Sequence, residues 1–335
     1  MLDDILHNPR VRAAIPGLSL ATLKAGEIAS VHALGTRGPH DHAEVDTHTV
    51  FEAASLTKPL VSYIALQLAE EGVLDLELPL HAICGAYVEG DERANAVTAT
   101  HVLTHTSGLP NIVGPQTPLK TYFAPGERFN YGSSAFAWLQ RAIERLTGCS
   151  LEELARSRIF EAFGMPDSSL HWRNRFESNH AQGREMDGQP VAKRRPLQAA
   201  ASWSLVTTAT DYARFVQVVL CGHGLSSEMH ARWFTPAVLA REGVDDVLNP
   251  NAVENKEVAW GLGWGLEPSQ GCFFHWGHNP GFRAFVMGSL NTRDAVVWFA
   301  NSARGLRLAR QVLPEILPGP HGSLDWLQIA GTLEE

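Results

Sequence analysis

The sequence has few cysteines and no long apolar segment. Its four cysteines, Cys84, Cys149, Cys221 and Cys272, form no C-x-x-C pair, which argues against a disulfide framework and against a zinc site. No segment approaches the roughly 18 consecutive apolar residues of a membrane helix, and the opening MLDDILHNPR lacks the apolar core of a signal peptide. We therefore expect reduced thiols, no contact with a membrane and a cytoplasmic location.

The signatures of several enzyme classes are also missing. The sequence contains no G-x-S-x-G elbow of α/β-hydrolases, no H-E-x-x-H zinc motif and no G-x-x-x-x-G-K-[ST] phosphate loop. Its 36 acidic residues outnumber 27 basic ones, giving a net charge of -9, and neither sign forms a long block. This charge pattern argues against a nucleic-acid surface, and nothing calls for a cofactor or a metal ion.

Strand-like segments lie near both ends of the chain. Apolar segments at 17–23 and 28–34, separated by Lys24-Ala25-Gly26-Glu27, predict a β-hairpin. Segments 272–277, 281–290 and 295–300 also have the character of strands. The sequence therefore predicts an α/β (α+β) fold, in which one antiparallel sheet is built from both ends of the chain and flanked by helices.

The middle of the chain is predicted to be mainly helical. Helical spacing of apolar residues and N-capping patterns recur between residues 75 and 221, whereas 222–258 is poorly patterned. We expect a discontinuous sheet lobe (1–74 and 259–335) and an inserted helical lobe (75–258), together forming a single catalytic unit. The cleft between two such lobes is the natural place for a binding site.

The segment Ser55-Leu56-Thr57-Lys58 lies where a short strand is expected to lead into a helix. Residues three apart on a helix have Cβ atoms about 5–6 Å apart, so Lys58 can reach the Ser55 hydroxyl. Amide groups at a helix start lack internal partners and can stabilise an oxyanion. Because an ordinary lysine is protonated at neutral pH, activation of Ser55 needs a lowered lysine pKa or a nearby tyrosine. Alternatively, Ser55 is only an N-cap.

Two further motifs supply such partners. Tyr131-Gly132-Ser133 lies just before an expected helix, and His275-Trp276-Gly277 lies in a strand near the C-terminal end. In order and spacing, the three motifs resemble the serine β-lactamase and penicillin-binding-protein superfamily, especially its class C-like, esterase and D-aminopeptidase branches. The segment 101–110, HVLTHTSGLP, is similar to the family's L-L-T-H-T-S-G-L segment. The resemblance extends from about Gly17 to Asn301.

The resemblance implies roles for the reacting groups. Ser55 would be the acylated nucleophile and Lys58 its activating partner. Tyr131 would act as general base and then as general acid. The backbone N–H groups of Ser55 and His278 would form the oxyanion hole.

It also implies a substrate-binding set, and here the sequence departs from the family's β-lactamases. That set comprises Ser133, His275, Trp276 and Gly277. The family's β-lactamases usually have Asn in place of Ser133 and Lys-Thr-Gly in place of His275-Trp276-Gly277. A histidine is only partly charged near neutral pH, so it would hold a substrate carboxylate less firmly than a lysine does. We therefore expect small esters or amides as substrates rather than β-lactams.

Several alternatives remain open at this stage. A β-lactamase, or a D-amino-acid or D,D-peptidase, would use the same residues on β-lactam-like or peptide substrates. An inert binding module on the same fold would keep the residues without the reaction. His275 could satisfy only a strand hydrogen bond, and Trp276 could be a pocket wall. The sequence does not indicate the oligomeric state.

Overall fold

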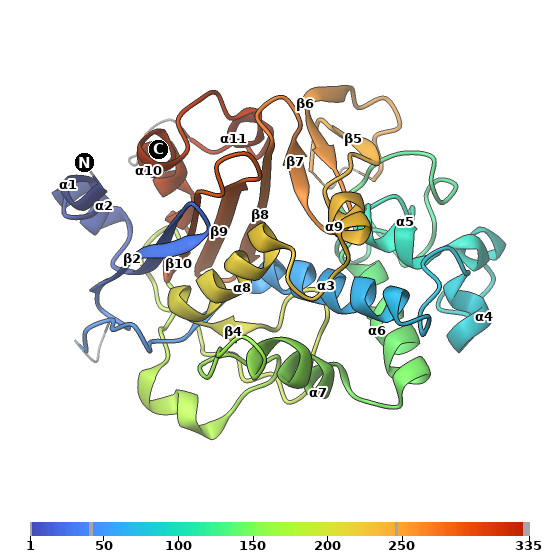
Figure 1. Cartoon of the computed structure of the whole chain (residues 1–335), viewed down its shortest axis with the longest axis horizontal. Helices are drawn as coiled ribbons and strands as arrows, with labels where there is room; N and C mark the ends of the chain where they lie inside the picture. The colour runs from blue at the N-terminus through green and yellow to red at the C-terminus, as the bar shows by residue number, and fades with distance from the viewer. Residues whose placement is uncertain (1, 40–42, 245–246, 331–335) are drawn as a thin grey trace.

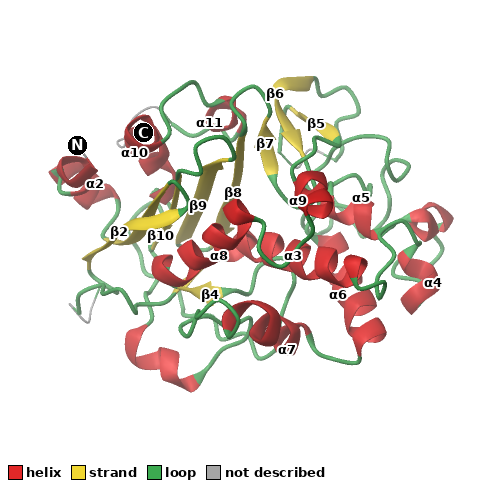
Figure 2. Cartoon of the chain, in the orientation of Figure 1, coloured by secondary structure: helices red, strands yellow, loops and turns green. Residues whose placement is uncertain are grey.

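A large antiparallel sheet forms the centre of the molecule (Figures 1 and 2). The computed structural model describes residues 2–39, 43–244 and 247–330. The sheet has eight strands in the order β2-β1-β10-β9-β8-β7-β6-β5, so strands from both ends of the chain lie side by side. This confirms the predicted fold class. The strands are β1 (Gly17–Lys24), β2 (Glu27–Gly35), β5 (Val238–Arg241), β6 (Glu254–Trp260), β7 (Gly265–Glu267), β8 (Cys272–Asn279), β9 (Phe282–Ser289) and β10 (Ala295–Ala300).

Helices cover both faces of this sheet (Figure 2). The α-helices are α1 (Leu2–Leu6), α2 (Pro9–Ala14), α3 (Thr57–Glu70), α4 (Leu80–Cys84), α5 (Ala99–Leu103), α6 (Ser134–Thr147), α7 (Leu151–Ala155), α8 (Ala209–Cys221), α9 (Ser227–Trp233), α10 (Ala309–Ile316) and α11 (Gly322–Trp326). Helices α3 and α8 pack on one face, and α1, α2, α10 and α11 pack on the other. Within the described part of the chain, no helix combines the length and apolar character that crossing a membrane requires.

Strand β10 shows how one apolar segment serves two cores. Its side chains alternate between the faces, as strand geometry requires. Val297 and Phe299 join the core under α3 and α8, whereas Val296 and Trp298 join the core under α10. Because both faces are covered, the strand is apolar without interruption, and all six of its residues are buried.

The sheet contains two strands from a segment that we expected to belong to the helical lobe. Strands β5 and β6 belong to it, although β5 and most of β6 fall within the expected helical lobe of 75–258. The reason is local: β6 opens with the polar residues Glu254-Asn255-Lys256-Glu257, whose side chains are exposed or half-buried near the sheet edge. A strand with such an opening, next to the edge strand β5, lacks the apolar alternation by which strands are recognised. Residue 1, residues 40–42 and residues 331–335 of the predicted sheet lobe lie outside the described residues, as do residues 245–246 of the predicted helical lobe.

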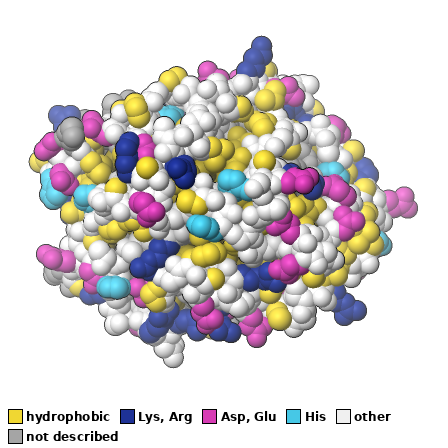
Figure 3. All heavy atoms as spheres, viewed as in Figure 1, with side chains coloured by type: hydrophobic (Ala, Val, Ile, Leu, Met, Phe, Trp, Pro, Cys, Tyr) yellow, Lys and Arg dark blue, Asp and Glu magenta, His cyan; other side chains and the backbone are white. Residues whose placement is uncertain are grey.

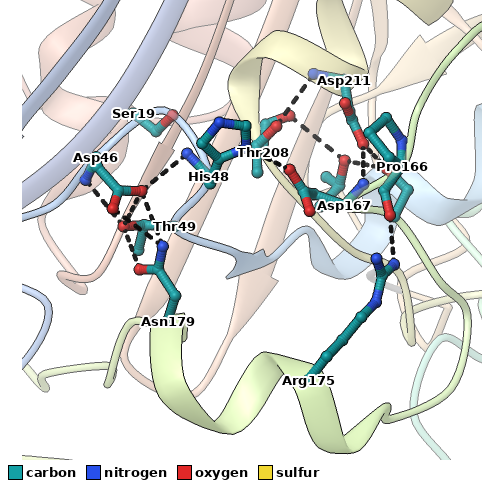
Figure 4. A network of polar contacts seen from close by, with 12 residues as sticks. Ser19, Asp46, His48, Thr49, Pro166, Asp167, Arg175, Asn179, Thr208 and Asp211 are labelled. Atoms are coloured by element: carbon teal, nitrogen blue, oxygen red, sulfur yellow. Dashed lines mark hydrogen bonds and ion pairs between the residues drawn. The ribbon is translucent and has the colours of Figure 1, made fainter.

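A polar network fixes the approach to the expected nucleophile (Figure 4). The loop before β3 (Phe51–Glu52) is held by Thr49, which donates to the Asn179 side chain at 2.7 Å, and by His48, whose ring bonds Asp167 at 2.8 Å. The Asp167 backbone N–H donates to Asp211 in the first turn of α8. Burial raises the pKa of Asp211 to about 6. Strand β3, which leads to Ser55, is thus anchored to α8 and to its partner strand β4 (Val206–Thr207).

The C-terminal segment is fastened to the sheet by a buried ion pair. His321 bonds the Glu267 carboxylate at 2.7 Å through Nδ1 and the Leu317 carbonyl at 2.7 Å through Nε2. Both ring nitrogens face acceptors, so the imidazolium form suits the site. Burial lowers the pKa of His321, but the Glu267 carboxylate and the Leu317 carbonyl outweigh it, and the pKa is raised above 6.5.

This raised pKa predicts a pH-dependent stability. A group whose pKa is raised on folding stabilises the folded state fully below its unfolded pKa, and that contribution is lost as pH rises through the folded value. The free energy of unfolding of wild type should therefore fall between pH 6 and pH 9 relative to that of His321→Gln. A tenfold difference in proton affinity between the folded and unfolded states corresponds to about 1.4 kcal/mol. Urea unfolding at both pH values measures this difference, and a constant difference between the two proteins would contradict it.

Candidate active site

Ser55 sits in a tight turn directly before α3. The turn is a 3-10 segment, Ala54–Leu56, and Ala54 has a φ of 52°, in the left-handed region that non-glycine residues rarely adopt. Thr57 stabilises this shape, since its hydroxyl donates to the Ala54 carbonyl at 2.6 Å and accepts from the Leu205 N–H at 3.0 Å. Strained backbone of this kind persists only where surrounding contacts fix it, and it is frequent at functional sites.

Lys58 lies beneath Ser55, one helical turn further on. Its Nζ donates to Ser55 Oγ at 2.9 Å and to the Ser202 carbonyl at 3.0 Å. The side chain is fully buried, and no acidic side chain pairs with it among the described residues. Burial therefore lowers the Lys58 pKa well below its ordinary value, which favours the neutral amine. A neutral amine beside a hydroxyl can accept its proton.

Tyr131 packs against the same lysine. Lys58 Nζ lies 4.8 Å from the centre of the Tyr131 ring. His105, which belongs to the segment 101–110 that resembles the family's sequence, holds the tyrosine loop in place. Its Nδ1 accepts the Gly132 N–H at 3.0 Å, and its ring lies 4.2 Å from that of Tyr131. Burial, with smaller effects of Lys58 and His275, lowers the His105 pKa well below 6.5, so its ring is neutral.

Strand β8 places His275 and Trp276 on opposite faces. Trp276 lies in the core under α10 and α11, with its ring 4.8 Å from that of Tyr131. His275 is completely buried, and its Nδ1 donates to the Trp276 carbonyl at 2.9 Å. Burial, with a smaller effect of Lys58, lowers the His275 pKa to about 3. His275 is thus a neutral, fully buried side chain next to Tyr131 and is not among the residues that line the cavity at Ser55, so its contact with substrate stays a prediction.

Gly277 allows β8 to approach the Ser55 turn. A Cβ atom built on Gly277 would lie well inside van der Waals contact of the Ala53 carbonyl oxygen, and it would also crowd Ala54. The absence of a side chain thus brings the next residue, His278, beside the turn that carries Ser55. Both Ser55 and His278 line one cavity. This is the arrangement that two backbone donors for an oxyanion would need.

The cavity at Ser55 has a volume of about 800 Å³. Tyr131 and Ser133 also line it, so the structure brings together Ser55, Tyr131, Ser133, Trp276 and His278, with Lys58 directly behind. Its lining includes the apolar side chains of Trp276, Val244, Leu306 and Leu327. Arg194, Trp203 and Asn279 line it as well. The sequence analysis did not select Arg194 or Asn279, since neither belongs to a local motif.

A model of the beta-lactamase family matches residues 2–317 of the 335. The chain belongs to the beta-lactamase family. This confirms the resemblance drawn from the three motifs, and it places the chain in a superfamily of serine hydrolases that includes penicillin-binding proteins. The order of Ser55, Lys58 and Tyr131 along the chain fits that membership, as does their arrangement, with Ser55 and Tyr131 lining one cavity and Lys58 bonded to Ser55.

Known members of the beta-lactamase family align over most of the chain. Penicillin-binding protein 4 of Amycolatopsis lactamdurans is 25% identical, with 97% of this chain and 94% of the relative covered. A solved class C beta-lactamase superimposes with a TM-score of 0.75 at 20% identity, covering 96% of each chain. A D-alanine carboxypeptidase AmpC from Burkholderia cenocepacia gives a TM-score of 0.73 at 21% identity, covering 90% of this chain and 93% of that one. At these identities, the two structures show a shared fold.

The close approach of β8 to the Ser55 turn at Gly277 predicts that adding one methyl group there lowers the stability of the protein. Gly277→Ala should lower the free energy of unfolding by about 1–3 kcal/mol, because the new Cβ must displace backbone at the Ser55 turn. Gly114→Ala is the matched control, since a Cβ there meets nothing closer than Thr117 Oγ1 at 3.9 Å. Urea unfolding of both variants measures the difference. Equal stabilities would show that β8 does not press on the turn.

Proposed function

We propose that this protein is a serine hydrolase that cleaves small esters or amides through an acyl-enzyme on Ser55. The observation that carries the proposal is Lys58, a fully buried lysine without an acidic partner among the described residues, bonded to Ser55 Oγ at 2.9 Å. In a purely structural role, this position would destabilise the fold, since burying an unpaired ammonium is costly. In a catalytic role, the same burial favours the neutral amine, which can accept a proton from the serine.

The proposed acylation uses two proton carriers. As Ser55 Oγ attacks the substrate carbonyl carbon, the neutral Lys58 amine takes the hydroxyl proton. The backbone N–H groups of Ser55 and His278 stabilise the negative oxygen of the tetrahedral intermediate. When that intermediate collapses and the bond to the leaving group breaks, Tyr131 gives its proton to the leaving oxygen or nitrogen. The resulting phenolate lies beside the Lys58 ammonium, which stabilises it.

Deacylation returns both groups to their starting states. The Tyr131 phenolate takes a proton from water, and the hydroxide attacks the acyl carbonyl. When the bond to Ser55 Oγ breaks, Lys58 returns its proton to the serine oxygen. In this order Tyr131 acts first as an acid and then as a base, the reverse of what the family resemblance implied. The reversal is supported by the burial of Lys58, which lowers its pKa and makes it the first base.

The cavity favours neutral substrates over β-lactams and peptides that end in a carboxylate. At the strand where the family's β-lactamases usually have a lysine, this chain has His275, which is buried and neutral. Trp276 occupies the cavity wall next to it. Arg194 is the only lysine or arginine among the cavity-lining residues in the described part of the chain, and it is paired with Glu52. A substrate carboxylate therefore finds no unpaired cation of these types there.

Removal of the nucleophile should abolish hydrolysis. Wild type should hydrolyse p-nitrophenyl butanoate faster than a chromogenic cephalosporin or D-alanine p-nitroanilide, whereas Ser55→Ala should hydrolyse none of them. Intact mass should show a phosphonyl adduct on wild type treated with a slow phosphonate ester, and none on Ser55→Ala. If the cephalosporin or the anilide is the better substrate, the activity is that of a β-lactamase or a D-peptidase. The absence of any turnover and any adduct would indicate an inert binding module.

The lowered pKa of Lys58 predicts the pH dependence of the reaction. Because the amine must be neutral to accept a proton, kcat/KM for a neutral ester should rise with pH through the lowered pKa and level off well below pH 10.5. Lys58→Arg, which stays charged, should lose at least ~100-fold in kcat/KM. Lys24→Arg is the control, since Lys24 is an exposed lysine paired with Asp294. A wild-type profile that still rises near pH 10.5 would contradict the role of Lys58.

A further inference from the structure

A three-part contact holds an arginine at one wall of the Ser55 cavity. The Arg194 guanidinium lies 4.7 Å above the ring of Trp203, and its Nε donates to Glu52 Oε2 at 3.0 Å. Its Nη2 donates to the same carboxylate oxygen. Glu52 is buried in β3, and Asn279 Nδ2 also donates to its Oε2, at 2.8 Å. The guanidinium is therefore fixed on one face by Trp203 and at one edge by Glu52, which belongs to β3 and is bonded to the last residue of β8.

The other edge of this guanidinium remains available to the cavity. A guanidinium has five N–H donors in a rigid fork, and Glu52 takes only those on Nε and Nη2. Within the described residues, Nη1 of Arg194 makes no hydrogen bond to protein, while its side chain is 33% exposed and lines the cavity. A purely structural arginine would direct its free donors to bulk solvent. The unused donors on Nη1 belong instead to a side chain that lines the same cavity as Ser55.

The position of Tyr131 indicates which part of a substrate meets Arg194. Under the proposed function, Tyr131 protonates the leaving group, so the leaving group lies toward Tyr131 and the Trp276 ring 4.8 Å from it. Arg194 and Trp203 line the same cavity, next to Ser202, whose carbonyl accepts from Lys58. A substrate whose leaving group lies toward Tyr131 can therefore extend its acyl part along the cavity toward Arg194.

We propose that Arg194 is a specificity-determining residue that donates to a neutral oxygen acceptor on the acyl chain, such as a keto, ester or amide carbonyl. Neutrality follows from the ion pair: Glu52 offsets the charge of Arg194, so a second carboxylate would be repelled by the first. A carbonyl oxygen needs only the donors that Glu52 leaves unused. Trp203 supplies an aromatic surface against which the chain can pack. This proposal rests on the proposed function and narrows its substrate class.

Matched esters separate this contact from general binding of the chain. The probes are p-nitrophenyl 5-oxohexanoate, p-nitrophenyl hexanoate and mono-p-nitrophenyl glutarate, which carry a ketone, a methylene and a carboxylate near the same position. Wild type should show kcat/KM for the oxo ester roughly tenfold or more above that for hexanoate, the value of a hydrogen bond to a charged donor. The glutarate should be no better than hexanoate.

Two arginines of the same loop provide the variant and its control. In Arg194→Lys, which keeps a cation for Glu52 but loses the fork, the oxo-to-hexanoate ratio should fall to near one. Arg195→Lys is the matched control: Arg195 pairs with Glu177 and lies over Trp172, but it does not line the cavity. It should leave the ratio and the hexanoate rate unchanged. Titration of Ser55 with a phosphonate ester gives the folded fraction of each protein.

The outcomes separate failure of this proposal from failure of the proposed function. If no ester is hydrolysed, the proposed function itself is wrong. If wild type hydrolyses the hexanoate but shows no preference for the oxo ester, this result alone overturns the role of Arg194. A preference that Arg194→Lys retains, or that Arg195→Lys equally removes, also overturns it. Preference for the glutarate over both other esters would show that the acceptor is anionic and would overturn the neutral assignment.

Discussion

The burial of the Lys58 amine without an acidic partner in the described structure is the constraint on which the site depends. An ammonium in this position would lose its hydration and gain only two neutral acceptors, Ser55 Oγ and the Ser202 carbonyl. The protein instead favours the uncharged amine, which makes the lysine a base. The surroundings follow the same rule, since His105 and His275 are both kept neutral by burial. Three nitrogen bases thus meet in one region with little positive charge among them.

Such a site needs backbone that presses closely around it. The Ser55 turn is held in a left-handed conformation at Ala54 by Thr57, and β8 reaches it only because Gly277 has no side chain. The sheet that presents β8 is covered on both faces, which keeps water from the buried side of the lysine. On the face seen in Figure 3, Lys, Arg, Asp and Glu side chains are interspersed at the surface, where they remain hydrated.

The parts of the fold that the sequence predicted are those with uninterrupted local patterns. The hairpin of β1 and β2 and the strands β8, β9 and β10 are apolar segments bounded by turn residues, and the structure confirms them. Strands β5 and β6 were missed because β5 is a short edge strand and β6 opens with four polar residues that are not buried. The position of His275 could have been foreseen. Neighbouring residues of a strand face opposite sides, so His275 and Trp276 could not both face the cavity.

The pairing of Glu52 with Arg194 shows what no local pattern could supply. The two residues are 142 positions apart, and neither lies in a recognisable motif. Glu52 is buried in β3, three residues before Ser55, and a buried carboxylate needs a partner that offsets its charge. Arg194 is that partner, and it also lines the cavity. The arginine that we propose as a donor to the acyl chain is therefore held by a carboxylate in the strand that leads to the nucleophile.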